Sequence, residues 1–83
     1  MYKLPRDISG RTLAKKLKNF GYEITRETGS HIRLSTEIMG YTHHITIPDH
    51  KFLKVSTLNN ILKDIGFYLK KEKRELIEIL FED

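Results

Sequence analysis

Apolar residues near the beginning of the chain recur at the spacing of an α-helix. Leu13, Leu17 and Phe20 fall on one side of a helix if residues 10–20 are helical. Ser9 is a residue type that caps helix N-termini, and Gly21 is one that ends helices. We therefore predict a first helix between Ser9 and Gly21.

From Tyr22 onward, the apolar residues alternate with polar ones, which is the pattern of β-strands. The predicted strands cover residues 22–25, 31–34 and 42–48. Turns are expected at Thr28-Gly29 and around Met39-Gly40, and Pro48 closes the third strand. The middle of the chain is therefore predicted to form a three-stranded antiparallel meander.

Helical spacing returns in the last third of the chain. Its apolar stripe consists of Leu58, Ile61, Leu62 and Ile65. Ser56 is the expected cap of this second helix and Gly66 its expected end. A further amphipathic segment covers about residues 69–81 and carries Leu69, Leu76, Ile77, Ile79 and Leu80. This segment is expected to pack either on the domain or on a partner.

The order helix, three strands, helix predicts an α+β domain with both helices on one face of the sheet. By strand parity, the residues expected to face the helices are Ile24, Ile32, Leu34, Ile45 and Ile47. The residues expected on the opposite, exposed face are His31, Arg33, His44 and Thr46. His31 is therefore predicted to lie outside the core.

A chain of 83 residues suits a single domain, here residues 1–83 with a core of about 4–68. It has no cysteine, which excludes disulfides and thiolate metal sites. It also has no apolar run long enough for a membrane span and no signal-peptide pattern. We expect a cytoplasmic protein without a membrane partner.

The net charge of +4 is unevenly distributed. Basic residues dominate residues 1–20 and 51–74, whereas residues 75–83 contain acidic residues and no basic ones. Basic surfaces attract anionic partners, although for any one lysine a solvated surface role is an equal alternative. Two basic blocks therefore flank the histidine-rich middle of the chain.

The four histidines do not follow a metal-binding pattern. Adjacent His43 and His44 point to opposite faces of a strand, and no His-Glu-x-x-His motif is present. We therefore expect no metal and no cofactor. Ser30 precedes His31, but neighbouring residues of a strand project apart, so we predict no serine-histidine dyad.

General acid or base catalysis on RNA fits His31 better, because the ribose 2′-hydroxyl supplies the nucleophile and histidine changes its charge near neutral pH. Arg33, on the same strand face, is the candidate that stabilises the negative transition state. Gly29 and Ser30 are candidates for close contact with the RNA backbone. An ordinary hairpin turn is the alternative interpretation of these two residues.

Four short motifs, in this order and spacing, resemble the HicA family of toxins, also described as YcfA-like. They are Leu-x-x-x-Gly-Tyr at 17–22, Arg-x-x-Gly-Ser-His at 26–31, Ile-Pro-x-His at 47–50 and Thr-Leu-x-x-Ile-Leu at 57–62. The resemblance covers about residues 4–68. It implies a double-stranded-RNA-binding-domain-like fold, an mRNA interferase activity and inhibition by a HicB-type antitoxin in a type II toxin-antitoxin system.

By the same resemblance, His31 holds the position of the catalytic histidine, acting as general base or acid without a metal. Our candidates for phosphate contacts are Lys15, Lys16, Lys18, Lys51 and Lys54. His50 either assists proton transfer or stabilises the loop, and we favour the structural role. Two alternatives stay open: a non-catalytic RNA-binding module, and an interaction protein that docks an acidic partner.

Overall fold

The computed structural model describes residue 4 and residues 7–81 of the chain. Two helical segments, three strands and two further helices follow one another along it. Their bounds are α1 Gly10–Leu17, η1 Lys18–Phe20, β1 Glu23–Glu27, β2 His31–Thr36, β3 His43–Pro48, α2 Val55–Leu69 and α3 Lys73–Phe81. The predicted α+β order is confirmed, and it agrees with a double-stranded-RNA-binding-domain-like arrangement.

The first helix begins and ends at the predicted residues. The Ser9 hydroxyl accepts a hydrogen bond from the Thr12 N–H, which satisfies a backbone donor that has no partner within the helix. A short 3₁₀ turn, η1, extends the helix to Phe20. Gly21 then ends it in the left-handed conformation, with φ at 78°.

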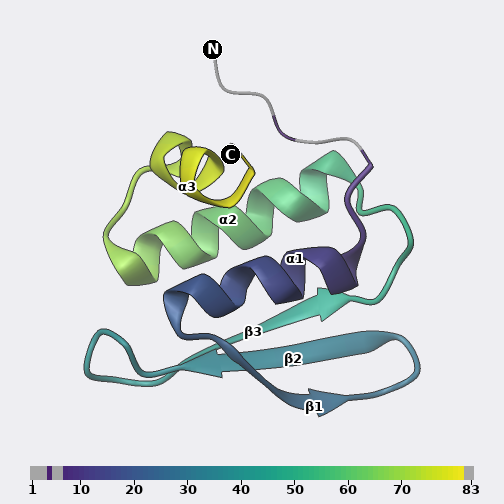
Figure 1. Ribbon diagram of the computed structural model, residues 1–83, viewed down its shortest axis with the longest axis horizontal. Coiled ribbons are helices and arrows are strands. Elements are labelled where there is room, and N and C mark those ends of the chain that lie inside the picture. Colours follow the sequence, from purple (N-terminus) through teal and green to yellow (C-terminus); the bar gives the residue numbers. More distant parts are fainter. Residues whose placement is uncertain (1–3, 5–6, 82–83) are drawn as a thin grey trace.

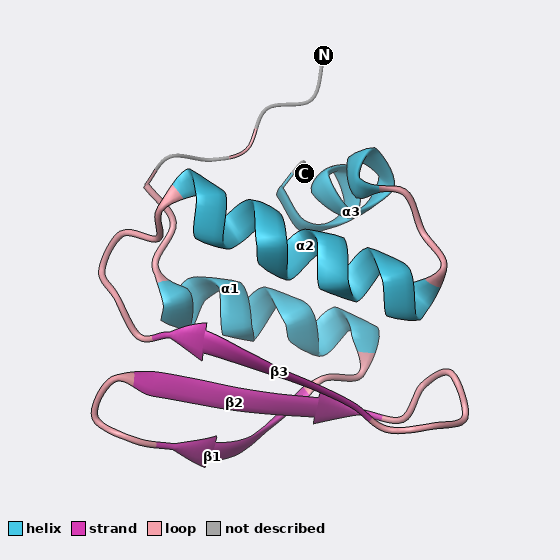
Figure 2. Ribbon diagram, turned by 180° about the vertical axis from the view of Figure 1, so that it is seen from behind, coloured by secondary structure: helices cyan, strands magenta, loops and turns pink. Residues whose placement is uncertain are grey.

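The three strands form one antiparallel sheet in the order β1-β2-β3. Figure 1 shows α1 and α2 on one face of this sheet, and the view from behind shows the same arrangement (Figure 2). The inward residues of β2 and β3 are buried: Ile32, Leu34, Ile45 and Ile47. Their outward neighbours are exposed, as parity predicted: His31, Arg33, His44 and Thr46. Ile24 of β1 is half-buried against the same core.

Two predictions about α2 are wrong. The helix begins at Val55, with Lys54 in the cap position and no capping side chain, so Ser56 lies inside its first turn. Gly66 also does not end the helix, which continues to Leu69. A side chain at Gly66 would place its Cβ 2.8 Å from the Lys71 carbonyl oxygen. The packing therefore requires a glycine at position 66, because the chain at Lys71 passes close to the helix.

The C-terminal segment forms α3 and packs on the same molecule. Leu76, Ile77 and Leu80 are buried and belong to the main hydrophobic core. Two of the five apolar residues of the predicted segment do not belong to the buried face of α3. Leu69 is the last residue of α2, and the side chain of Ile79 is 48% exposed. Figure 1 shows α3 lying against α2, on the side of the helical layer away from the sheet. Among the described residues, no helix has the length and apolarity to cross a membrane.

Candidate active site at the start of β2

The turn between β1 and β2 is built around the Thr28 side chain. Its hydroxyl oxygen accepts hydrogen bonds from the N–H groups of Ser30 (3.4 Å) and His31 (3.1 Å). The Thr28 N–H donates to the His31 carbonyl oxygen at 3.0 Å. From the other side, the Asp49 N–H donates to the Ser30 carbonyl oxygen at 2.9 Å. The backbone before and at His31 is therefore held by two separate segments of the chain.

His31 and Ser30 contact each other directly. The Ser30 Oγ lies 2.9 Å from the His31 Nδ1, within hydrogen-bond distance. This corrects the expectation that the two side chains project apart. That expectation applied strand geometry to both residues, but β2 begins at His31 and Ser30 still belongs to the turn, where side chains do not alternate.

This contact leaves the Nε2 of an exposed imidazole ring for other partners. When Nδ1 donates its proton to Ser30 Oγ, Nε2 carries a lone pair and can accept a proton. When the Ser30 hydroxyl donates to Nδ1, a neutral ring carries its proton on Nε2 and can donate it. The arrangement thus serves a general base or a general acid, and in both cases Ser30 restricts the orientation of the ring.

Arg33 lies on the same sheet face as His31, two residues further along β2. It pairs across the sheet with Thr46, and its side chain is exposed. Among the described residues, no ion pair joins Arg33 to a carboxylate. Its guanidinium is therefore available to an anionic group beside His31.

Gly29 is exposed at the tip of the same turn. A Cβ built at this position has no atom within 4 Å, and the backbone φ is not in the left-handed region. Neither the conformation nor the packing of this chain therefore requires glycine here. An approaching ligand would be a sufficient reason for the absent side chain.

Two ion pairs of Arg11 lie beside the turn. The sequence patterns did not predict them. The Arg11 Nη2 contacts two carboxylates: it lies 2.7 Å from the Glu27 Oε1 and 3.0 Å from the Asp49 Oδ2. The hydrogen bonds to Glu27 and Asp49 and their charges raise the pKa of Arg11 above its usual value. Arg11 was counted in the basic block, but here it joins α1 to the end of β1 and to the loop after β3.

The loop after β3 continues from Asp49, whose N–H contacts Ser30, into His50 and Lys51. The His50 carbonyl oxygen accepts a hydrogen bond from the Gly10 N–H at 3.0 Å, while its side chain is exposed. Lys51 follows, with its ammonium 5.7 Å from the centre of the Phe52 ring. Lys54, at the start of α2, is exposed as well. The backbone of His50 thus holds the loop, and two of the five candidate lysines lie on the chain that leaves the site.

The first helical segment leads away from His31. The beginning of α1 lies beside His50, but the helix leads away from it, and at its far end the Thr36 hydroxyl donates to the Phe20 carbonyl oxygen. Thr36 is the last residue of β2, whereas His31 is the first. Lys18 is therefore near the opposite end of β2 from His31. Lys15 is exposed, and Lys16 borders a hollow with Asp7 and Phe81.

A separate cluster around His43 lies between the sheet and α2. The Tyr22 hydroxyl is 2.7 Å from the His43 Nδ1, and the His43 Nε2 is 3.4 Å from the Asp64 Oδ1. The His43 ring also stacks on Tyr68, with centroids 4.6 Å apart. Burial raises the pKa of Tyr22 above its usual range, and the charges of Tyr68 and Asp64 add to this effect. A carboxylate only accepts hydrogen bonds, so the His43 Nε2 carries the proton that faces Asp64; in a neutral ring Nδ1 is then an acceptor, and the Tyr22 hydroxyl donates to it.

The remaining exposed histidine, His44, contacts Ser35 across the sheet, with Oγ and Nδ1 2.5 Å apart. His43 and His44 face opposite sides of the sheet, as expected for neighbours in a strand. Within the described ranges, no three histidine or acidic side chains are grouped so that they could hold a metal ion.

Thr28 could have been found from the sequence, because a threonine two residues before a serine in a Gly-containing turn is a common turn former. The Arg11 network and the Tyr22–His43–Asp64 chain carry no comparable local signal. Their members are far apart in the sequence and meet only in the folded chain.

Comparison with known proteins gives one match. The sequence model of a family described as "HicA toxin of bacterial toxin-antitoxin" matches residues 10–67, which is more than half of the chain. The matched segment begins with α1 and ends near the end of α2, and it includes the turn that holds His31. Searches of curated proteins and of solved structures found no match.

Proposed function

The chain belongs to the HicA toxin family of bacterial toxin-antitoxin systems, and from this premise we propose that it is an mRNA interferase, an endoribonuclease that uses His31 and no metal ion. The observation that carries this proposal is the exposed His31 ring, held through Nδ1 by Ser30 with its Nε2 left open. Such a ring suits proton transfer to or from a substrate that lies on the sheet surface.

In the proposed reaction, His31 Nε2 takes the proton of a ribose 2′-hydroxyl, and the 2′-oxygen attacks the adjacent phosphorus. The bond from phosphorus to the 5′-oxygen breaks, and this oxygen takes a proton from solvent water. The products are a 2′,3′-cyclic phosphate and a 5′-hydroxyl end. The nucleophile comes from the RNA, so the protein needs only to move the proton and stabilise negative charge.

Arg33 is proposed to stabilise the charge that develops on the phosphate oxygens, because its exposed guanidinium shares a sheet face with His31. The Ser30 hydroxyl is proposed as the positioning group for the imidazole ring, and Gly29 as the point of closest approach of the RNA backbone. Lys51 and Lys54 are proposed to bind flanking phosphates, since they lie on the loop next to the site.

For Lys15, Lys16 and Lys18, we propose a more distant role along the RNA path, because α1 leads away from His31. The proposed inhibitor is a HicB-type antitoxin that covers the His31 face. Its binding would exclude RNA from the same exposed surface.

The test is cleavage of single-stranded mRNA with a chelator present. The wild-type chain is expected to cut RNA. His31→Ala is expected to cut it about 10²- to 10⁴-fold more slowly, because this is the rate factor that a positioned acid or base typically contributes. His44→Ala is a matched control, because His44 is another exposed, serine-bonded histidine on the same sheet face.

Equal activity of wild type and His31→Ala would remove His31 from the mechanism. If neither protein cuts RNA but both bind it, the alternative of a non-catalytic RNA-binding module is the correct one. In that case binding should fall steeply with salt, because phosphate contacts release counterions.

A further inference from the structure

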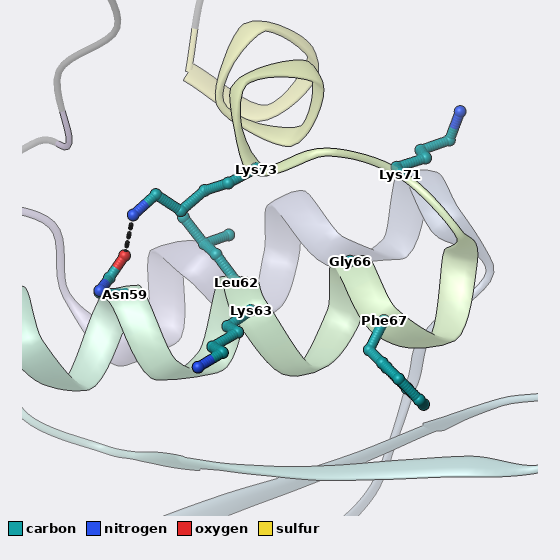
Figure 3. Close-up of a pocket in the computed structure, with 7 residues that line it drawn as sticks. All are labelled: Asn59, Leu62, Lys63, Gly66, Phe67, Lys71 and Lys73. Carbon is teal, nitrogen blue, oxygen red and sulfur yellow. Dashed lines mark hydrogen bonds between the residues drawn. The ribbon is translucent and has the colours of Figure 1, made fainter.

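A groove lies between α2 and α3, in the helical layer and away from the His31 face. Its volume is about 520 Å³, within the range of ligand-binding pockets. Figure 3 shows its lining: Asn59, Leu62, Lys63, Gly66, Phe67, Lys71 and Lys73. Most of these residues come from one side of α2; Lys71 lies in the chain that leads into α3, and Lys73 is the first residue of α3.

The groove combines an exposed aromatic ring with positive charges. Phe67 is 86% exposed and therefore contributes little to the core. Lys63 and Phe67 project outward from α2, and Lys73 reaches back from the start of α3 to donate a hydrogen bond to the Asn59 side chain (Figure 3). Asn59 is neutral, so the charge of Lys73 is not compensated by this contact.

The acidic side chains near this groove contact other groups and do not line it. Glu72 pairs with Arg74, and the Glu75 carboxylate accepts from the Glu72 N–H. Asp64, on α2, interacts with His43. The described lining of the groove therefore has three lysines and no carboxylate, a composition that favours an anionic ligand.

We infer that this groove is a second RNA-contacting surface, which binds a single-stranded segment with a base stacked on Phe67 and phosphates held by Lys63, Lys71 and Lys73. Single-strand-binding proteins combine a basic groove with aromatic stacking platforms in the same way. A protein partner fits less well, because lysine is depleted at the centre of protein interfaces. The inference rests on RNA being the substrate of the proposed function, and it extends the RNA path beyond the cleavage site.

The experiment measures affinity for a fluorescently labelled single-stranded RNA over a range of salt concentrations, with every protein carrying His31→Ala so that the probe stays intact. Phe67→Ala should weaken binding roughly fivefold or more, because one base no longer has an aromatic ring to stack on. The slope of log K against log salt should stay the same. Lys71→Gln with Lys73→Gln should instead reduce that slope by about 0.7 for each phosphate that a lysine no longer neutralises.

Two control variants match these changes outside the groove. Ile79→Ala removes an exposed apolar side chain of α3, and Lys70→Gln removes an exposed positive charge at the end of α2, from a residue with no ion pair in the described part of the chain. Neither residue lines the groove. Both controls should bind RNA like the parent, and circular dichroism should show that all variants are folded.

A chain that cuts RNA but binds it equally with and without Phe67 would overturn this inference and leave the proposed function intact. The inference is also overturned if the lysine pair changes the salt slope no more than Lys70→Gln does. Conversely, a chain with wild-type His31 that never cuts RNA but loses affinity with Phe67→Ala would support the groove and overturn the proposed function.

Discussion

At the scale of single residues, the site depends on where a turn becomes a strand. Ser30 is the last residue before β2 and His31 is the first residue in it, so their side chains do not follow the alternation of a strand. The resulting contact of 2.9 Å gives Ser30 a role in orienting the ring. A role of this kind should affect the reaction rate more than substrate binding.

Replacing Ser30 with alanine tests that role. Ser30→Ala should lower kcat for RNA cleavage by roughly tenfold to a hundredfold, because a ring that is no longer held spends less time in the productive orientation. KM should change little, and the free energy of unfolding should stay nearly constant, since Ser30 is exposed. Steady-state kinetics on a short RNA separate the two parameters.

Ser35→Ala is the matched control, because Ser35 makes the same kind of contact with His44 further along the sheet face. If both serine variants keep wild-type kcat, the contact between Ser30 and His31 does not contribute to catalysis.

Gly29 allows a clean separation of folding from function. Gly29→Ala should leave the melting temperature unchanged or slightly raised, because the added methyl group meets open space and reduces the freedom of the unfolded chain. RNA cleavage should nevertheless fall, because the methyl group would stand between the turn and the RNA backbone. Thermal unfolding and cleavage are measured on the same preparation. Undiminished cleavage would show that Gly29 only forms a turn.

Local patterns predicted the exposed positions of His31 and Arg33, because strand parity depends only on neighbouring residues. They could not predict the ion pairs of Arg11 with Glu27 and Asp49, since Asp49 lies 38 residues from Arg11 and no local rule links them. They also misjudged Ser30, because its geometry depends on the residue at which the strand begins.

At the scale of elements, the helix and strand order followed from apolar spacing, while the bounds of α2 did not. Gly66 was interpreted as a helix end because glycine often takes that position. In the fold, Lys70 takes the left-handed conformation instead, with φ at 58°, and the Lys71 N–H donates to the Gly66 carbonyl oxygen. The reason for a glycine at 66 is the close passage of the chain before α3, which is a tertiary feature.

A methyl group at position 66 should therefore destabilise the protein. In an exposed helix, alanine is about 1 kcal/mol better than glycine, but here the new Cβ would meet the Lys71 carbonyl oxygen at 2.8 Å. We expect Gly66→Ala to lower the free energy of unfolding by about 1 to 2 kcal/mol, as for other overpacked sites. Urea unfolding measures the change.

Asn60→Ala provides the comparison within α2, because Asn60 is exposed and alanine favours helices. It should be neutral or stabilising. A stabilised Gly66→Ala variant would show that the chain before α3 moves away easily.

At the scale of the whole molecule, the Tyr22–His43–Asp64 chain joins the sheet to the helical layer. Tyr68 extends this connection, since its ring stacks on His43 and its hydroxyl donates to the Tyr41 carbonyl oxygen at 2.6 Å. The same hydroxyl accepts from the Met39 N–H at 3.0 Å. The loop between β2 and β3 is thus fixed on α2 by one side chain.

The burial of Tyr22 predicts a loss of stability at alkaline pH. The pKa of Tyr22 is raised in the folded state, so the folded protein holds this proton more tightly than the unfolded one. Its contribution is complete below the unfolded pKa of about 10 and decreases as the pH rises above that value. The free energy of unfolding, measured by urea from pH 8 upward, should therefore decline above about pH 10.

Tyr22→Phe should be less stable at neutral pH, because His43 loses its partner, but its decline at alkaline pH should be shallower. Parallel pH curves for the two proteins would contradict the role assigned to the Tyr22 hydroxyl.

The sheet order β1-β2-β3 places each strand beside its neighbour in the sequence. Such local pairings keep the loops that must close short, and mixed domains of this kind fold in about milliseconds to fractions of a second. Synthesis of 83 residues at roughly 5 to 20 residues per second takes several seconds. The enzyme proposed here would therefore reach its active form soon after leaving the ribosome. An inhibitor would have to be present in the cell before the toxin is synthesised. An inhibitor synthesised afterwards would not protect the mRNA that is cleaved first.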